Sequence, residues 1–371
     1  MSLDELRRRI DAIDDAVLSL LDQRAEVVGQ VGEEKRRLGL PFHDPERERT
    51  TLDRLAARGA GRFPREAIRA VYREVMSACL ALQSPVSVAF LGPEGTFTHA
   101  AARSLFGLAA RYREASTLEG VVDAVRRGAS TYGVVPVENS TEGSVTSATD
   151  ALLEGGAQIR AERVLSIDHC LLARAPELGA VERVYSHPQA LAQCRGWLAR
   201  NLPGAQLIQT TSTAGAVREA SGDPGGAAVA SALAGELHGL PMLRPHIQDR
   251  SENATRFVVV GQADAPRTGR DKTTVAFSLA DEPGALRSAL EIFHAQGLNL
   301  SRIESRPSRQ RAWEYVFLAD LHGHREDEPV ARALDALRAR CAAVTLLGSY
   351  ARDDGEPAAG GSATTQEGDA R

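Results

Sequence analysis

The stretch Tyr-Gly-Val-Val-Pro-Val-Glu-Asn-Ser-Thr-Glu-Gly-Ser, residues 132–144, joins a short apolar segment to a run of polar side chains. Residues 132–137 are mostly apolar and β-branched, which predicts a buried β-strand. Glu138, Asn139 and Ser140 follow directly, and in an open α/β sheet ligands bind at the carboxyl ends of the strands. A hydroxyl or amide side chain followed by a glutamate also fits the N-terminal cap of a helix. The stretch alone leaves both interpretations open.

Three other stretches in the same region place small or polar residues beside a predicted strand. They are Gly-Pro-Glu-Gly-Thr-Phe-Thr (92–98) after a strand at 86–91, Ser-His-Pro-Gln-Ala-Leu-Ala-Gln-Cys (186–194) after a strand at 181–185, and Asn-Ala-Thr-Arg-Phe (253–257) before a strand at 258–260. The glycines of the first stretch let the backbone approach a ligand, and a helix predicted from about His99 offers N–H groups to an anion. Together the four stretches resemble prephenate dehydratase, in that family's order.

This resemblance implies a two-lobed α/β domain over residues 86–263, like that of periplasmic binding proteins, which converts prephenate to phenylpyruvate. Because the departing ring hydroxyl needs a proton or strong hydrogen bonds, a donor must face it. The family's key hydroxyl is Thr255, which is therefore the candidate donor. The implied substrate contacts are Thr96, Glu138, Asn139, Ser140, Ser186 and Gln193. Arg256 fits a structural ion pair as well as a substrate contact, and His187, before a proline, fits a structural role.

The N-terminal region, residues 1–84, predicts three helices. Apolar residues recur at helical spacing over residues 2–37 without a proline, and Gly39-Leu40-Pro41 ends the pattern. Such a helix is about 50 Å long at 1.5 Å per residue, too long to pack only on itself in a small domain. Further helices are predicted at 45–58 and 64–83. One overlong helix among three predicts an intertwined dimer.

Polar residues of these helices follow a second pattern. Arg7, Arg24 and Lys35 are spaced at 17 and 11 residues, near whole numbers of helical turns. The R-x-x-I-D-x-I-D start, the E-K-R sequence around Lys35 and the D-x-x-R-E motif at 44–48 resemble the all-helical class of chorismate mutase. The resemblance implies the following roles: Arg7 from the partner subunit, Arg24 and Arg47 hold carboxylates, Lys35 and Gln83 donate to the ether oxygen, Glu48 and the Asp44 backbone hold the ring hydroxyl, and Cys79 stands where some members have serine. A dimerisation coil with solvated arginines is the alternative.

The C-terminal region predicts a linker at 264–270 and then a β-α-β-β-α-β order over 271–351, typical of ferredoxin-like domains. Its elements are predicted at 273–279, 281–296, 301–305, 313–321, 328–341 and 344–347. The P-G-A-L and E-S-R-P stretches resemble the ACT regulatory domain. By this resemblance an L-phenylalanine site comprises Gly284, Ala285, Leu286, Asn299, Leu300, Glu304, Ser305, Arg306 and Pro307. The tail, residues 352–371, has the composition of a disordered segment.

Composition excludes several classes of protein. The chain has 371 residues, enough for two or three domains, and its net charge of −5 argues against a generic nucleic-acid binder. No stretch has the length of a membrane span or the pattern of a signal peptide, and four scattered cysteines fit reduced thiols, so a cytoplasmic location is expected. The nine histidines lack metal-ligand spacing, and neither reaction requires a metal or an organic cofactor.

The three resemblances together imply a bifunctional enzyme whose partners are chorismate, prephenate, the effector L-phenylalanine and a second copy of the chain. Two competing interpretations stay open. In one, the α/β region is a ligand-binding regulator without catalysis, although Thr255 in its N-x-T-R-F context is not required for binding alone. In the other, the dehydratase is retained and the N-terminal helices only dimerise, which the function of Lys35 decides.

Overall fold

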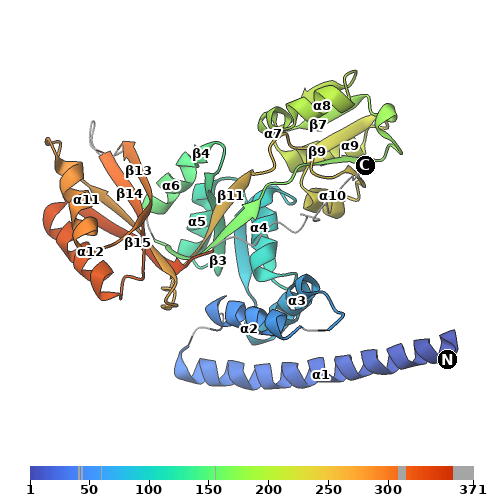
Figure 1. Ribbon diagram of the computed structural model, residues 1–371, viewed down its shortest axis with the longest axis horizontal. Coiled ribbons are helices and arrows are strands. Elements are labelled where there is room, and N and C mark those ends of the chain that lie inside the picture. The colour runs from blue at the N-terminus through green and yellow to red at the C-terminus, as the bar shows by residue number, and fades with distance from the viewer. Residues whose placement is uncertain (41, 43–44, 60, 155, 308–314, 354–371) are drawn as a thin grey trace, which may run out of the picture. The chain divides into compact units, whose positions relative to one another are not determined.

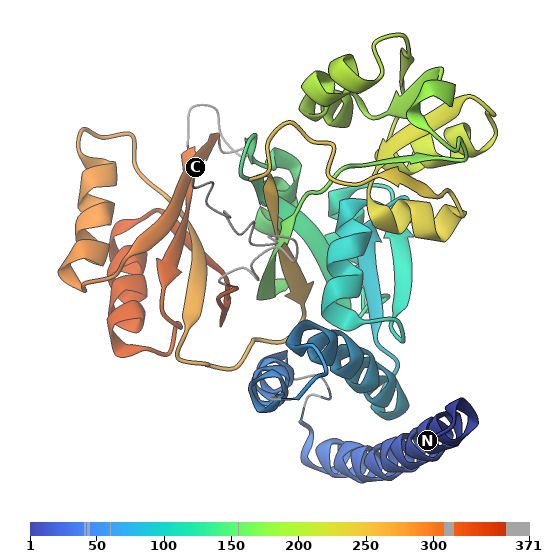
Figure 2. The ribbon, with the colours of Figure 1, turned by 45° about the vertical axis from the view of Figure 1, so that its right-hand side comes forward.

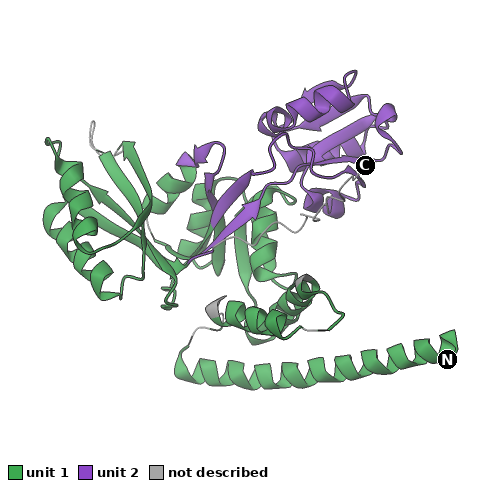
Figure 3. Ribbon diagram, in the orientation of Figure 1, with its two compact units in different colours: residues 1–135, 147–161, 258–351 green, residues 136–146, 162–257, 352–371 purple. Residues whose placement is uncertain are grey.

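The computed structural model describes residues 1–40, 42, 45–59, 61–154, 156–307 and 315–353. It divides into two compact units, which we describe separately (Figure 3). Unit 1 comprises Met1–Val135, Ser147–Ala161 and Val258–Ala351, and unit 2 is built mainly from Pro136–Thr146 and Glu162–Phe257. No helix among these described residues is both long and apolar enough to cross a membrane.

Unit 1 begins with the three predicted helices, α1 (Leu3–Leu38), α2 (Pro45–Arg58) and α3 (Arg65–Gln83) (Figure 1). Ser2 caps α1 by accepting the N–H of Glu5 (3.2 Å), and Gly39 ends it in the left-handed region at φ 66°. Gly32 is the one buried residue of α1. Many large apolar side chains of α1 are exposed in the single chain, among them Leu6, Ile10, Ile13, Val17, Leu20, Val27 and Val31.

An α/β region follows in the chain. Its parallel strands β1 (Ser87–Leu91), β2 (Arg111–Ala115) and β3 (Tyr132–Asn139) lie in the order β2-β1-β3, with helices α4 (Phe97–Phe106) and α5 (Leu118–Arg126) in the connections. The remaining elements here are β4 (Gly143–Ser144), α6 (Thr146–Leu153), β5 (Gln158–Ser166) and β11 (Ala254–Gly261). The larger sheet has the order β13-β14-β12-β15-β5-β11-β3-β1-β2, and β4 pairs with β3.

Unit 2 contains a five-stranded sheet of order β10-β6-β9-β7-β8. Its elements are β6 (Cys170–Ala173), a 3-10 helix (Leu178–Ala180), β7 (Arg183–Ser186), α7 (Pro188–Gln193), α8 (Arg195–Asn201), β8 (Gln206–Gln209), α9 (Thr213–Ser221), β9 (Gly226–Ala230), α10 (Ala232–His238) and β10 (Met242–Arg244). One core packs Leu191 and Leu198 of α7 and α8 on the sheet, and another packs Val217 and Ala234 of α9 and α10 on it. Helices therefore cover both faces, as an α/β lobe requires.

The C-terminal part of unit 1 has the predicted β-α-β-β-α-β order: β12 (Asp271–Ser278), α11 (Ala285–Ala295), β13 (Leu300–Pro307), β14 (Tyr315–His322), α12 (Glu328–Arg340) and β15 (Ala343–Ala351). Both helices lie on one face of the antiparallel sheet, where Phe277, Phe293 and Leu334 share a core (Figure 2). Strands β12, β13 and β15 are longer than predicted. Residues 313 and 314 of the predicted third strand, and residues 354–371 of the predicted disordered tail, lie outside the described residues.

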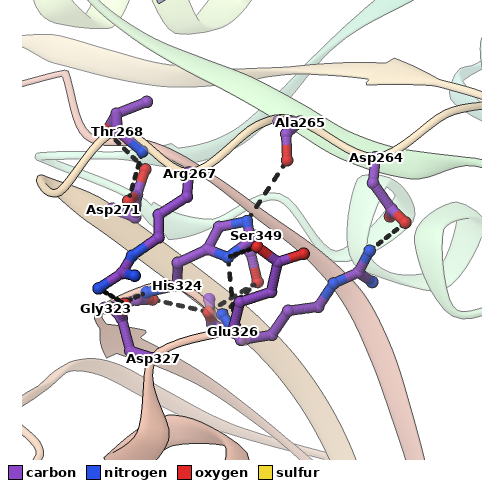
Figure 4. A network of polar contacts seen from close by, with 12 residues as sticks. Asp264, Ala265, Arg267, Thr268, Asp271, Gly323, His324, Glu326, Asp327 and Ser349 are labelled. Carbon is purple, nitrogen blue, oxygen red and sulfur yellow. Dashed lines mark hydrogen bonds and ion pairs between the residues drawn. The ribbon is translucent and has the colours of Figure 1, made fainter.

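The predicted linker at 264–270 has no regular structure but is held onto the C-terminal domain (Figure 4). His324, which is buried, donates through Nε2 to the carbonyl of Ala265 (3.3 Å), and Arg267 pairs with Asp327. The hydroxyl of Thr268 donates to Asp271 over 2.6 Å. Side chains of the domain thus fix the path of the linker before β12 begins.

Candidate active sites

A pocket of about 570 Å³ lies among α1, α2 and α3. It gathers five of the predicted residues: Arg24, Lys35, Arg47, Glu48 and Gln83. Arg54 and Cys79 also line it. Arg54 was not among the predicted residues, although it lies seven residues after Arg47, two helical turns along the same face of α2, and this spacing was a usable signal.

Two buried polar groups of this pocket have no hydrogen-bond partner in the described part of the chain: Nη1 of Arg24 and Oε1 of Gln83. Buried polar groups in proteins are nearly always satisfied, so such a pair indicates a ligand or solvent. Nζ of Lys35 donates to the carbonyl of Phe42 over 2.7 Å. Gln83 packs on Gly32, where an added Cβ would lie 3.0 Å from Cγ of Gln83. The glycine therefore makes room for the glutamine.

Arg7 is not part of this pocket. It lies 17 residues before Arg24 on the same helix, roughly 25 Å away along the axis at 1.5 Å per residue. In the single chain it is exposed and pairs with Asp4 at 3.5 Å. Asp44, the other predicted contact, lies outside the described residues.

In unit 2, Asn139 and Thr255 meet although they are distant in sequence. Nδ2 of Asn139 donates to Oγ1 of Thr255 over 2.8 Å. Oδ1 of Asn139 accepts the backbone N–H groups of Thr141 (3.0 Å) and Glu142 (3.2 Å). Glu138 and Asn139 pair with β4, so they belong to β3, and residues 140–142 form the turn between the two strands. The stretch is therefore not the cap of a helix, and α6 begins only at Thr146.

The two backbone N–H groups fix the orientation of the Asn139 side-chain amide, and this in turn fixes the amides of Asn253 and Gln193. An N–H can only donate, so the atom of Asn139 that faces them is its oxygen and the NH₂ group faces Asn253 and Thr255. Nδ2 of Asn139 donates to Oδ1 of Asn253 (2.9 Å), and Nδ2 of Asn253 donates to Oε1 of Gln193 (3.1 Å). Nε2 of Gln193 donates to Glu142 (3.2 Å). Each amide thus donates to the next one, from Asn139 through Asn253 to Gln193.

A pocket of about 420 Å³ opens at the Gln193 end of this network, lined by Thr141, Glu142, Gln189, Ala192, Gln193, Gln248, Asp249, Arg250 and Asn253. Arg250 is exposed here and forms no ion pair within the described residues. A guanidinium in this position is suited to hold a carboxylate. Arg250, Glu142 and Asn253 were not among the predicted site residues, although Asn253 is the first residue of the N-x-T-R-F stretch.

Other predicted residues of unit 2 make structural contacts. Arg256 pairs with the buried Glu162 at 2.7 Å, which favours the ion-pair interpretation, and lies 3.8 Å from Glu138. The hydroxyl of Ser186 donates to the carbonyl of Val229 (2.6 Å). A second hydroxyl, of Ser140, donates to a backbone carbonyl at 252 and accepts the N–H at 254 (2.9 Å). His187 caps α7, in line with its predicted structural role.

The loop between β1 and α4 uses backbone N–H groups internally. The N–H of Gly95 donates to Nδ1 of His99 (3.1 Å), and that of Glu94 donates to Glu114. Oγ1 of Thr96 accepts the N–H of His99 (3.3 Å) and so caps α4. These two loop N–H groups are therefore not offered to a ligand, and the carboxylate contact of Thr96 stays a prediction.

In the C-terminal domain, α11 starts after Gly284, which has φ 86°. The E-S-R-P residues end β13, the edge strand of the larger sheet. Arg306 pairs with Asp150 of α6 at 3.1 Å and lies 3.7 Å from Glu304. Asn299 lies 3.4 Å from His322. The predicted effector residues thus occupy the start of α11, the edge strand β13 and, for Asn299, the loop directly before that strand.

Comparisons with known proteins match these three regions in order. Chorismate mutase type II matches residues 6–84, prephenate dehydratase matches 88–265, and the ACT domain matches 273–339. A bifunctional chorismate mutase/prephenate dehydratase of Aquifex aeolicus is 46% identical over 352 residues, which cover 94% of this chain and 97% of the relative. A bifunctional relative from Pseudomonas aeruginosa is 40% identical over 354 residues, 94% of this chain and 97% of its own length.

Solved structures resemble the region after the helices. Prephenate dehydratase from Arthrobacter aurescens, solved in complex with L-Phe, is 40% identical with a TM-score of 0.68, covering 74% of this chain and 92% of that one. A protein described as a novel type of quorum quenching acylase is 32% identical with a TM-score of 0.67, covering 72% of this chain and 98% of that one.

The fold and the matches define an enzyme with an all-helical mutase domain, a central α/β dehydratase domain and an ACT domain. The chain belongs to the family of bifunctional chorismate mutase/prephenate dehydratases, enzymes of phenylalanine biosynthesis. It therefore carries both activities, and the prediction of a bifunctional enzyme is confirmed.

Proposed function

We propose that Thr255 and its network form the dehydratase site and that the pocket among the three helices is the mutase site. The observation that carries the first assignment is the hydrogen bond from Asn139 to Thr255. Because Oγ1 of Thr255 accepts this bond, its hydroxyl hydrogen is left to donate, and the described residues include no acceptor for it. That donor suits the ring oxygen of prephenate.

In the dehydration, the bond to the ring carboxylate and the bond to the ring hydroxyl both break. The electron pair of the bond to the carboxylate stays on the ring as CO₂ leaves and completes the aromatic system, and the departing hydroxyl takes up a proton from solvent to become water. A hydrogen bond from Thr255 stabilises the oxygen as negative charge grows on it. An ordinary threonine hydroxyl is a weak acid, so Thr255 orients and donates a hydrogen bond and does not ionise. Substrate contacts are proposed for Thr96, Glu138, Ser140, Ser186 and Gln193.

The mutase step is a unimolecular rearrangement in which the ether C–O bond breaks as a C–C bond forms. It needs no nucleophile or base, so the protein holds the reactive conformation and stabilises charge on the ether oxygen. Arg24 and Arg47 hold carboxylates, Lys35 and Gln83 donate to the ether oxygen, and Glu48 binds the ring hydroxyl. The unpartnered buried Nη1 of Arg24 supports its role in holding a carboxylate. The unpartnered atom of Gln83 is Oε1, which only accepts, so the donation to the ether oxygen is assigned to Nε2 of Gln83.

One assay of the unmodified protein tests whether it carries out both reactions. Chorismate is supplied to the pure protein, and prephenate and phenylpyruvate are followed separately over time. Prephenate should appear first and then decline as phenylpyruvate accumulates. If chorismate stays unchanged while prephenate supplied directly is still dehydrated, the helices serve only for dimerisation.

A second copy of the chain completes the mutase site in this proposal. The apolar side chains exposed along α1 form a surface suited to packing against a second chain. In addition, Arg7 lies too far along its own helix from Arg24 for the two to bind one ligand. Arg7→Ala and Lys35→Ala variants, each inactive as a mutase, should regain activity when co-expressed, because a mixed dimer has one site with both residues. No recovery in a mixed dimer isolated by two affinity tags would place Arg7 outside the partner's site. The four free cysteines fit a reducing compartment, so a cytoplasmic location is part of the proposal.

L-phenylalanine is the proposed effector and binds at Gly284–Leu286, Asn299, Leu300 and residues 304–307. The backbone at the start of α11 suits the carboxylate of an amino acid, and the exposed edge of β13 suits a second chain. Coupling between the effector and prephenate is reciprocal, typically about 1–3 kcal/mol. Calorimetry should therefore show that L-phenylalanine binds and that prephenate lowers its affinity. L-phenylalanine should lower the affinity for prephenate by the same factor. No binding at millimolar effector would remove the regulatory role and leave both activities standing.

A further inference from the structure

His169 has no assigned role, yet it is buried beside the dehydratase network. Only 2% of the residue is exposed, and Nε2 lies 2.8 Å from Oε1 of Gln193. The backbone N–H of His169 donates to Oε1 of Gln248 (3.0 Å), and its carbonyl accepts the N–H of Ile247 (2.8 Å). The main chain on which this ring is mounted is therefore held from both sides.

The orientation of the network fixes which nitrogen of His169 carries hydrogen. Oε1 of Gln193 faces the NH₂ group of Asn253 and is an acceptor, so Nε2 of His169 must donate to it. Burial is the main cause that lowers the pKa of His169, which keeps the ring neutral at neutral pH. With two donors on Oε1, the amide of Gln193 cannot rotate, and its NH₂ group is held toward Glu142 and the pocket.

We propose that His169 is a positioning residue of the dehydratase, which acts by fixing the amide of Gln193 against the substrate. The inference rests on the proposed assignment of Gln193 as a substrate contact. A packing histidine with no effect on Gln193 is the alternative, and it predicts loss of stability without coupling to Gln193. The two differ in a measurable way because a positioning effect disappears when Gln193 itself is removed.

The test compares matched variants at His169 alone and in a Gln193→Ala background. His169→Leu removes the donor at similar volume, whereas His169→Gln places an amide N–H near the former Nε2. We expect His169→Leu to lower kcat/KM for prephenate roughly 10- to 100-fold, in the range that misplaced substrate contacts cost. His169→Gln should restore most of that loss. Should the leucine variant not fold, His169→Asn, which is polar but too short to reach Gln193, replaces it.

The double-mutant cycle decides the outcome. In the Gln193→Ala background, adding His169→Leu should change kcat/KM by less than about twofold, since contacting residues in one network are not additive. Two outcomes would overturn the positioning role of His169 and leave the assignment of Gln193 standing. One is an equal loss of kcat/KM on His169→Leu in both backgrounds. The other is parental activity of His169→Leu while Gln193→Ala is impaired. Parental activity of Gln193→Ala overturns both this role and the assignment of Gln193. Chorismate mutase activity, measured on the same samples, reports the amount of native protein.

Discussion

Asn139 donates a hydrogen bond from Nδ2 to Oγ1 of Thr255 over 2.8 Å, although the two residues are 116 positions apart in the chain. Two backbone N–H groups hold the other side of the Asn139 amide, so the direction of this bond is set by the fold. The hydroxyl hydrogen of Thr255 is thereby directed to another acceptor, which we assign to the substrate.

Asn139→Asp should inactivate the dehydratase while preserving the shape of the side chain. A carboxylate cannot donate to Thr255, so the hydroxyl would donate to the carboxylate and no longer to the substrate. We expect kcat for prephenate to fall by about 10²–10³, the usual cost of losing a preorganised donor. Steady-state kinetics measure the loss, with mutase activity as the control. Dehydration at the parental rate would show that the direction of this bond does not matter.

Gly32→Ala should impair the mutase through Gln83. The added methyl stabilises an exposed helix by about 1 kcal/mol in general, but here it would lie 3.0 Å from Cγ of Gln83 and push the amide out of place. We expect a lower kcat for chorismate together with an unchanged or higher melting temperature. Gly29→Ala, on the same helix with nothing within 4 Å of the added methyl, is the matched control. Equal mutase rates for the two variants contradict the positioning of Gln83 by Gly32.

Mild acid should destabilise the β1–α4 loop through His99. This ring stacks on Phe90 with centroids 4.4 Å apart, and burial, aided by Arg103, lowers its pKa from 6.5 to about 4. The folded state therefore binds fewer protons than the unfolded state between pH 6.5 and about 4. The contribution of neutral His99 to the free energy of unfolding is present above pH 6.5 and decreases as the pH falls toward 4. It is equivalent to roughly 3 kcal/mol at most.

His99→Phe isolates this contribution, because the variant lacks the titrating group. Urea unfolding at pH 7, 5.5 and 4.5 should show the parent losing more stability than the variant as the pH falls. A stability difference between the two that is the same at all three pH values would mean that His99 does not stay neutral in the folded protein.

The ion pair between Arg306 and Asp150 should transmit the effector signal. Arg306 belongs to the E-S-R-P stretch, and Asp150 lies on α6, the helix that follows the β3–β4 turn in the chain. Asp150→Asn should leave L-phenylalanine binding measurable by calorimetry and reduce the maximal inhibition of the dehydratase at least about fivefold, the lower end of typical coupling. Asp123→Asn, at an exposed ion pair on α5, is the control. If L-phenylalanine inhibits the dehydratase of the Asp150→Asn variant as strongly as that of the parent, the ion pair does not transmit the effector signal.

The helices and the order of the C-terminal domain follow from local signals. The apolar spacing of α1 and the turn at Gly39 need no tertiary information, so the predicted span of 2–37 agrees with Leu3–Leu38. Strand ends were less predictable, because pairing decides them. Thr255 and Arg256 were placed before a strand but lie within β11, and Asn139 lies within β3 because it pairs with Gly143 of β4.

The candidate sites were predicted as types of residue and not as networks. Lys35 and Gln83 come together because α1 and α3 pack, which the spacing of charges within one helix cannot show. His169 carries no sequence signal, since its importance arises only from a contact with Gln193, 24 residues away. Interactions of this kind depend on side chains that the fold assembles from several elements.

In the proposed assignment, one chain holds two separate active sites, one dependent on Lys35 and the other on Thr255. The most direct measurement gives kcat/KM for chorismate and for prephenate in Lys35→Ala, Thr255→Ala and Thr255→Ser. We predict that Lys35→Ala loses the mutase by about 10²–10³ and keeps the dehydratase, that Thr255→Ala does the reverse, and that Thr255→Ser retains more dehydratase activity than Thr255→Ala. Parental activity of Lys35→Ala toward chorismate, or of Thr255→Ala toward prephenate, would contradict the account.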